Sequence, residues 1–280
     1  KIFSRIDEKF IGFEESYMSV GENKRIRAKL KDGQDFVEMQ NLINKPREIK
    51  DKCEIKKIAE AEKIGDMAFE YVLGRIKEGV TEREIALDLE FFMKKQGATA
   101  LSFDTISASG IRSAMPHGIA TDKKIENGDF LTLDFGCVFE GYCSDMTRTV
   151  VIGSASEKQR EIYDTVLKAQ ETALLGIRPG MKGSQIDAMA RDVITDAGYG
   201  KYFGHALGHS VGLEIHENPN FSPREETVIK PGMVITVEPG IYIEGIGGVR
   251  IEDVVIITED GCENITHSTK KLLELTAQKG

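Results

Sequence analysis

The spacing of apolar residues predicts two pairs of helices in separate parts of the chain. Over residues 54–77, apolar side chains recur every three or four positions, as on the buried face of a long amphipathic helix. Residues 81–84, Thr-Glu-Arg-Glu, form a capping box that begins a second helix ending at Gly97. Residues 157–175 and 184–197 later show the same arrangement. The chain therefore contains one helical plan twice.

Matching residues at identical spacing support an internal duplication. Four positions of the first helix pair recur in the second: Ile76, Gly79, Ile85 and Gly97 correspond to Ile177, Gly180, Ile186 and Gly198. A longer frame, I-x-x-G-x-x-x-T-[LV]-[DE]-x-G, occurs at residues 125–136 and again at 229–240. We therefore expect two related halves, each with two helices followed by strands and a hairpin, facing one central site.

Each copy of the frame leads into a predicted β-hairpin that carries two acidic residues. In the first, the turn Glu140-Gly141 leaves Asp134 and Asp145 on opposite arms at similar distances. Cross-strand Cβ atoms lie about 5 Å apart, and carboxylates that close repel each other unless a cation lies between them. In the second hairpin, Glu238 and Glu252 take these places. One such pair could be a solvated strand face, but two related pairs indicate a metal site.

Three of the five histidines fall within one short stretch, between residues 204 and 217. Its glycines and β-branched residues favour a strand or loop, and the H-E-x-x-H signature of a zinc-binding helix is absent. We expect His209 to complete the site with the four carboxylates. His117, His205 and His216 are expected to flank the metals without binding them, and His267 to have an ordinary structural role.

The proposed ligands favour a pair of hard divalent cations. Four carboxylates and one imidazole suit Mn²⁺, Fe²⁺, Co²⁺ or Zn²⁺, and lack the thiolates of a structural zinc site. Cys143 precedes Asp145 by two residues and could offer a thiolate, although all the other donors are oxygen or nitrogen. Two metals about 3.5–4 Å apart can activate a water and polarise a carbonyl group. The predicted chemistry is hydrolysis.

Composition excludes several classes of protein. The 280 residues are 40% hydrophobic and carry a net charge of −9 without basic clusters, which argues against nucleic acid or an anionic membrane as partner. No apolar run approaches the roughly 20 residues of a membrane span, and no signal peptide is visible. The four cysteines form no C-x-x-C pair, so we expect free thiols and a cytoplasmic protein.

The ordered ligand set resembles that of the pita-bread metallopeptidases, which include methionine aminopeptidases, Xaa-Pro aminopeptidases and prolidases. The resemblance covers about residues 53–275, and stretches 103–110, 144–149 and 208–217 resemble the proline-specific branch. It implies an α+β pita-bread fold with duplicated halves around a central antiparallel sheet. Residues 51–280 would form the catalytic domain, and residues 1–50 a remnant of a truncated creatinase-like N-terminal domain.

The resemblance also implies a role for each metal ligand. Asp134 would chelate one metal, and His209 and Glu238 the other, while Asp145 and Glu252 would bridge the two. A hydroxide held between the metals would attack the carbonyl carbon before proline, and Glu238 would shuttle its proton.

The remaining site residues are expected to act on the substrate. By resemblance, His216 would stabilise the tetrahedral intermediate, while His117 and His205 would bind the peptide near the scissile bond. Tyr242 and Arg250 would support the ligands or contact substrate. An apolar wall for the proline ring is expected in the stretch around residues 211–213, between His209 and His216, and near His117.

The function implied is a dinuclear aminopeptidase, with Mn²⁺ as the preferred metal, that removes the residue before a penultimate proline. A prolidase restricted to Xaa-Pro dipeptides and a methionine aminopeptidase are the alternatives within the family. A non-catalytic peptide-binding module is the alternative of another class. The expected partners are peptides with proline at the second position, and the full-length protein could form a homodimer.

Overall fold

The computed structural model describes residues 5–39 and 42–276, and the chain divides into two compact units, residues 1–47 and 48–280. The smaller unit holds two parallel strands, β1 (Phe10–Phe13) and β2 (Asp35–Glu38), with helix α1 (Val20–Arg27) between them in the sequence. Its buried aromatic rings, Phe13 and Phe36, stack with centroids 4.4 Å apart. The interpretation of residues 1–50 as a domain remnant stays a prediction.

The larger unit begins after a short 3-10 helix, η2 (Lys45–Glu48), with the first predicted helix pair. Asp51 caps α2 (Lys52–Leu73) by accepting hydrogen bonds from the backbone N–H groups of Cys53 and Glu54. The predicted capping box at Thr81 begins α3 (Glu82–Lys95) and is confirmed. The strands and short helix that follow are β3 (Ala100–Leu101), β4 (Ile106–Ser109), η3 (Gly110–Ala114), β5 (Phe130–Phe135), β6 (Cys137–Phe139), β7 (Tyr142–Cys143) and β8 (Met146–Ile152).

The second half repeats this order. It starts with α4 (Glu157–Gly176) and α5 (Gly183–Asp196), within one residue of the predicted bounds. The elements after them are η4 (Gly200–Tyr202), β9 (Gly208–Ser210), β10 (Glu217–Phe221), β11 (Val234–Val237), β12 (Gly240–Ile243), β13 (Gly247–Arg250), β14 (Asp253–Ile257), β15 (Cys262–Asn264) and β16 (Glu274–Leu275).

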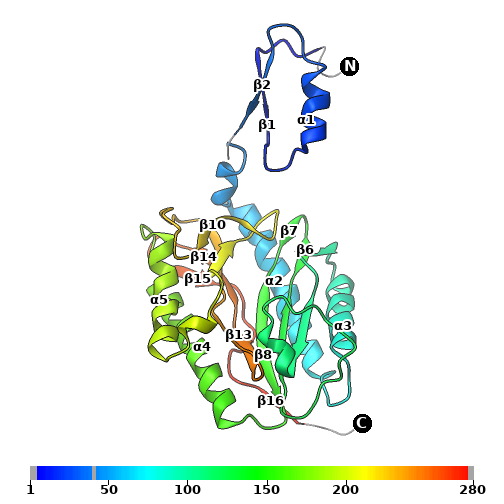
Figure 1. Cartoon of the computed structure of the whole chain (residues 1–280), viewed down its shortest axis with the longest axis vertical. Helices are drawn as coiled ribbons and strands as arrows, with labels where there is room; N and C mark the ends of the chain where they lie inside the picture. The colour runs from blue at the N-terminus through cyan, green and yellow to red at the C-terminus, as the bar shows by residue number, and fades with distance from the viewer. Residues whose placement is uncertain (1–4, 40–41, 277–280) are drawn as a thin grey trace. The chain divides into compact units, whose positions relative to one another are not determined.

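Each helix pair packs on strands of its own half, and Figure 1 shows α4 and α5 at the left of the larger unit and α3 at its right. One hydrophobic core joins α2 and α3 to β5 and β8, and another joins α4 and α5 to β11 and β14. The main sheets have strand orders β16-β8-β5-β4 and β10-β9-β11-β14-β15. The described residues thus have a mixed α+β architecture, with one core in each half and a smaller third cluster around Val211 and Val234.

The turns between paired helices show the duplication in backbone geometry. Gly79 and its counterpart Gly180 have φ angles of 89° and 91°, a region that disfavours residues with a side chain. Gly97 and Gly198, after the second helix of each pair, also have positive φ. The repeated glycines therefore mark positions where each half needs the same left-handed turn.

The first hairpin differs from the simple ladder expected from the sequence. Asp134 lies opposite Thr147, whereas Asp145 lies in a short break between β7 and β8. At Gly136 any Cβ would come within 2.0 Å of the carbonyl oxygen of Ser144, so the two arms approach very closely there. The hairpin consequently divides between two sheets, and the two acids are diagonal neighbours.

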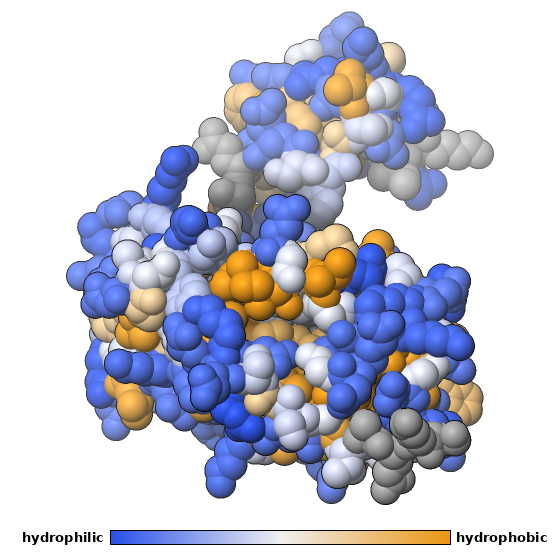
Figure 2. Space-filling view, turned by 60° about the horizontal axis from the view of Figure 1, so that its bottom comes forward, coloured by the Kyte–Doolittle hydropathy of each residue, from blue (hydrophilic) through white to orange (hydrophobic). Residues whose placement is uncertain are grey.

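One face of the larger unit carries mostly polar side chains. Figure 2 shows hydrophilic side chains over most of the visible face of the larger body, with hydrophobic side chains gathered towards its middle. Among the described residues, no helix combines the length and apolar character that a membrane crossing requires.

Candidate metal centre

The five predicted ligands come from five places near strand ends and line one cavity of about 610 Å³. Asp134 is in β5 and His209 in β9, while Asp145 lies just before β8. Glu238 directly follows β11, and Glu252 directly precedes β14. Strands from both halves therefore bring their acids to a common site, although the ligands are far apart in the sequence.

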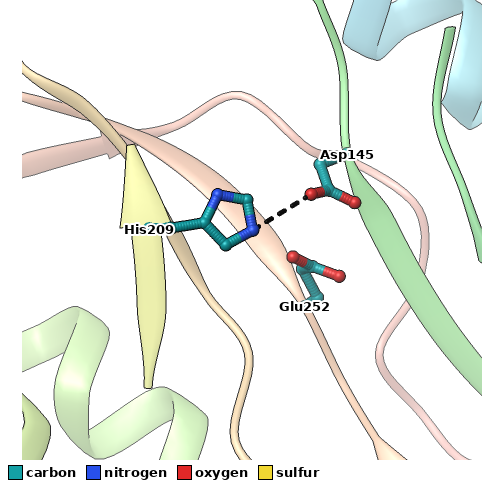
Figure 3. Close-up of side chains that lie close together, drawn as sticks. All are labelled: Asp145, His209 and Glu252. Atoms are coloured by element: carbon teal, nitrogen blue, oxygen red, sulfur yellow. Dashed lines mark ion pairs between the residues drawn. The ribbon is translucent and has the colours of Figure 1, made fainter. Parts of the chain in front are cut away.

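Asp145, His209 and Glu252 form the tightest group. One ligand atom from each lies within 4.8 Å of the others, and Figure 3 shows the three side chains pointing toward one another. His209 Nε2 is 3.4 Å from Asp145 Oδ2 and 3.4 Å from Glu238 Oε1. His209 Nδ1 lies 3.2 Å from the carbonyl oxygen of Ser210, which can only accept a hydrogen bond. In the neutral ring the Nε2 lone pair therefore faces two carboxylates, which suits a cation between them.

Two buried oxygens of the cluster have no hydrogen-bond partner within the described chain, Asp134 Oδ1 and Glu252 Oε1. A buried acceptor without a hydrogen-bond partner lowers the stability of the fold unless another group, such as a cation, binds to it. Burial, followed by the neighbouring carboxylates, raises the pKa values of Asp145 and Glu252 well above their usual range. Oxygen donors, an imidazole lone pair and crowded negative charge fit divalent cations well.

Arg250 and Thr147 donate hydrogen bonds to two of the carboxylates, those of Asp134 and Glu252. The Arg250 guanidinium donates to Asp134 Oδ2 through Nη2 and to Thr147 Oγ1 through Nε, the latter at 3.0 Å. The Thr147 hydroxyl in turn donates to Glu252 Oε2 at 2.6 Å. Each of these contacts joins the first hairpin to the second.

Tyr242 and His205 continue this network away from the metal ligands. Arg250 Nη1 donates to the Tyr242 hydroxyl at 2.8 Å, and that hydroxyl lies 2.9 Å from His205 Nε2. His205 Nδ1 is 2.8 Å from the carbonyl oxygen of Ala206, so the neutral ring carries its proton there. Burial lowers the pKa of His205 to about 4. His205 lines the cavity, but both its nitrogens are already hydrogen-bonded.

His117 and His216 are placed differently. Both line the cavity with exposed side chains, and neither ring hydrogen-bonds to any described residue. The His216 ring lies 4.3 Å from that of His209, centroid to centroid, and burial lowers its pKa. These two rings are free to contact a ligand. His267 is exposed and Cys143 is buried, and neither lines the cavity.

The apolar wall lies partly where it was predicted. Val211 is fully buried in a core cluster, and neither it nor Leu213 lines the cavity. The expectation is therefore wrong for Val211 and Leu213, although Ile215 of the same stretch between His209 and His216 does line the cavity. The expectation for the approach to His117 is supported. The apolar lining comprises Phe103, Ile106, Pro116, Ile119 and Ile215.

Several supporting residues had no place in the sequence prediction. Glu62 on α2 is fully buried, accepts a hydrogen bond from the backbone N–H of Asp145, and has its pKa raised to about 8 by burial. Asp187 and Arg191 on α5 form a bidentate ion pair, and Arg191 also donates to the carbonyl oxygen of His205. Glu62 falls on the apolar face of its helix, a signal that the sequence did contain.

The chain is similar to several known peptidases. The model of metallopeptidase family M24 matches residues 56–259. An Xaa-Pro dipeptidase of Pyrococcus furiosus is 50% identical over 255 residues, which cover 91% of this chain and 72% of that protein. The solved Xaa-Pro dipeptidase from Bacillus anthracis matches with a TM-score of 0.94 and 51% identity, over 95% of this chain and 75% of that one. An X-Pro aminopeptidase from Thermotoga maritima matches with a TM-score of 0.90 and 43% identity, over 95% and 75%.

These matches confirm the predicted pita-bread fold, and they extend across both halves of the larger unit. Members of the matched family are peptidases that use divalent metal ions, in agreement with the donor set found here. The chain belongs to metallopeptidase family M24.

Proposed function

We propose that this metallopeptidase hydrolyses the peptide bond before proline, with Xaa-Pro dipeptides as its preferred substrates and two divalent cations, Mn²⁺ first among them, as cofactors. The observation that carries the proposal is the convergence of four carboxylates and the His209 Nε2 lone pair, including two unpartnered buried oxygens, on one partly apolar cavity. A dipeptide preference revises the aminopeptidase expected from the sequence. Relatives named Xaa-Pro dipeptidase, 50% and 51% identical, support this revision.

The five converging side chains would hold the cations, with Asp145 and Glu252 shared between them. When bound, such a pair of cations polarises a carbonyl group and makes water a better nucleophile near neutral pH. The chain's own side chains would orient the peptide, accept a proton and stabilise the developing negative charge.

Glu238 is the group best placed to accept the proton. Burial raises the pKa of its carboxyl group in the metal-free chain, and bound cations would favour the ionised form, which is the form that can accept a proton. Its Oε1 accepts a hydrogen bond from the Thr236 hydroxyl at 3.2 Å, which leaves further lone pairs for the reacting water.

His216 and His117 are suited to contact the scissile bond. Burial lowers the pKa of His216, so its ring is neutral at pH 7 and keeps one N–H donor. A donor aimed at the developing oxyanion lowers the barrier because it acts most strongly in the transition state. His205, with both nitrogens occupied, would instead support Tyr242 and Arg250.

The apolar lining suits proline. A proline after the scissile bond has no N–H to donate and a fixed φ, so it needs an apolar surface rather than an acceptor. Phe103, Ile106 and Ile119, with Pro116 and Ile215, offer such a surface along the cavity.

A panel of peptides assayed with Mn²⁺ tests this proposal. The panel holds one N-terminal residue constant and compares Xaa-Pro, Xaa-Pro-Yaa and Xaa-Ala. We expect the highest kcat/KM on Xaa-Pro. We also expect roughly tenfold less on Xaa-Ala, because lost ring contacts amount to about 1–2 kcal/mol. Equal rates on Xaa-Pro and Xaa-Ala would contradict the proline assignment.

The aminopeptidase is the second candidate. The 43% identical structure titled X-Pro aminopeptidase favours it, because its match covers the same share of this chain as that of the dipeptidase. In the same panel, a higher kcat/KM on Xaa-Pro-Yaa than on Xaa-Pro would select this candidate.

A further inference from the structure

Glu62 is a buried acid that does not face the cavity. It lies on α2 with no exposed surface, among apolar neighbours of the first core such as Ala61 and Phe69. A carboxyl group in such a place is costly unless hydrogen bonds satisfy it. Its partners therefore show what it does in the fold.

The Glu62 carboxyl group joins two segments that carry metal ligands. Its Oε1 accepts a hydrogen bond from the backbone N–H of Asp145 at 2.7 Å. Its Oε2 accepts one from the Thr266 hydroxyl at 3.0 Å, and that hydroxyl accepts from the backbone N–H of Val254 at 2.9 Å. Val254 follows Glu252 by two residues. One carboxyl group thus connects the backbones beside Asp145 and Glu252.

The position of Asp145 makes this connection important. Asp145 lies in the break between β7 and β8, outside either strand. Glu252 lies just outside β14 in the same way, and its own N–H donates to the carbonyl oxygen of Thr147 at 3.1 Å. Glu62 therefore supports the two ligands where regular strand pairing ends.

We propose that Glu62 is a positioning residue for the metal centre, and that it maintains the spacing between Asp145 and Glu252, the two ligands expected to bridge the cations. The inference rests on the metal centre of the proposed function. It does not depend on the peptide that is cleaved. Groups that orient ligands from behind commonly change metal affinity by about 10–100-fold when they are removed.

Asp66 offers a matched control on the same helix. It lies one turn after Glu62 and accepts hydrogen bonds from the backbone N–H groups of His267 and Ser268, at 2.9 and 2.7 Å. It therefore anchors the same C-terminal segment to α2 from a half-buried position. It makes no hydrogen bond to a ligand or to the backbone beside one.

The test is calorimetric titration of the metal-stripped full chain with Mn²⁺, without peptide. We expect Glu62→Ala to weaken Mn²⁺ binding by about 10–100-fold, and Asp66→Ala to leave it near the unmodified value. Glu62→Gln should restore binding, because its amide oxygen can accept from Asp145 while its NH₂ donates to Thr266. Urea unfolding of each variant verifies that the protein titrated is folded.

Equal Mn²⁺ affinity in Glu62→Ala and Asp66→Ala would overturn the inference, and so would failure of Glu62→Gln to restore binding. If Glu62→Ala does not fold, Thr266→Val replaces it. This variant removes the hydroxyl that joins Glu62 to Val254 and keeps the hydrogen bond from Asp145 to Glu62, and unchanged Mn²⁺ affinity would then overturn the inference. Absence of Mn²⁺ binding in the unmodified chain is a different result, because it contradicts the proposed metal centre itself.

Discussion

The two ligand-bearing hairpins share a sequence frame but hold their acids differently. In the first, Asp134 lies opposite Thr147, and Asp145 lies in a break supported by α2. In the second, Val237 pairs with Asp253, so Glu238 and Glu252 directly flank a regular ladder. Both hairpins divide between two sheets, because β12 and β13 form a sheet separate from that of β11 and β14. They differ in their link to α2: the Asp145 backbone donates directly to Glu62, whereas the backbone beside Glu252 reaches Glu62 through Thr266.

Each hairpin also donates a side-chain hydrogen bond to a metal-ligand candidate of the other hairpin. Thr147 of the first donates to Glu252 of the second, and Arg250 of the second donates to Asp134 of the first. The ligands are therefore encoded within each hairpin, but their relative placement comes from contacts across the two. Disrupting a ligand and disrupting a cross-hairpin contact should have different consequences.

The largest effect is expected from loss of a second-hairpin ligand. Glu238→Ala removes both a metal ligand and the proposed proton acceptor. Bound metals contribute several kcal/mol to transition-state stabilisation, so kcat/KM on an Xaa-Pro dipeptide should fall by at least about 10³-fold. Metal content and activity are measured on the same preparation, and a variant that keeps both would exclude Glu238 from the centre.

The next largest loss of activity is expected from His216→Ala, which tests whether this histidine contacts substrate or binds metal. His216→Ala should lower kcat by about 10²–10³-fold, as loss of an oxyanion donor does, while metal content stays unchanged. His267→Ala is the control, because that exposed histidine lies outside the cavity. Loss of metal from His216→Ala would show that the ring is a ligand.

The pH dependence of folding tests the network behind Arg250. Since the pKa of His205 is about 4 when folded and near 6.5 when unfolded, the unfolded chain binds the additional proton between these values. Stability from this group is complete above about pH 6.5 and is lost as the pH falls toward 4, by at most about 3 kcal/mol.

Urea unfolding of the metal-free chain between pH 4.5 and 7, compared with His205→Gln, measures that contribution. The difference in unfolding free energy between the two proteins should shrink or change sign as the pH falls. A difference that does not vary with pH would mean that His205 is not held neutral in the folded state.

The smallest loss of Mn²⁺ affinity is expected from removing one hydrogen bond between the two hairpins. Thr147→Val keeps the shape of the side chain but removes the hydroxyl between Arg250 and Glu252. Mn²⁺ affinity should weaken by about tenfold, at the lower end of the range for groups behind a ligand. Thr132→Val is the matched control, because its hydroxyl contacts Thr149 and Gly248 instead of a ligand. Equal affinities in the two variants would mean that the hairpins are placed independently.

The four acidic ligand candidates could be predicted because they lie in two related hairpins that follow a repeated frame, and His209 because it lies in a short stretch with three histidines. The bounds of α4 and α5 were also close, since the capping box and apolar spacing are local signals. The first helix was predicted to run to residue 77 but ends at Leu73. The close approach at Gly136 was not visible, because it depends on how two arms of a hairpin bend together.

The supporting contacts could not be predicted for a related reason. Thr147 and Glu252 are separated by 105 residues, and Arg250 and Asp134 by 116. Such pairs leave no periodic pattern in a single sequence. Glu62 was the exception, because an acid on the apolar face of a helix signals a buried partner.

The most direct test of the central claim is the number of Mn²⁺ ions bound per chain at the point where hydrolysis of an Xaa-Pro dipeptide reaches its maximum. The measurement titrates metal-stripped protein and follows binding and rate in parallel. We expect two Mn²⁺ ions bound per chain, with negligible hydrolysis before metal is added. Full hydrolysis by the metal-free protein, or maximal hydrolysis with no ion bound, would contradict the central claim.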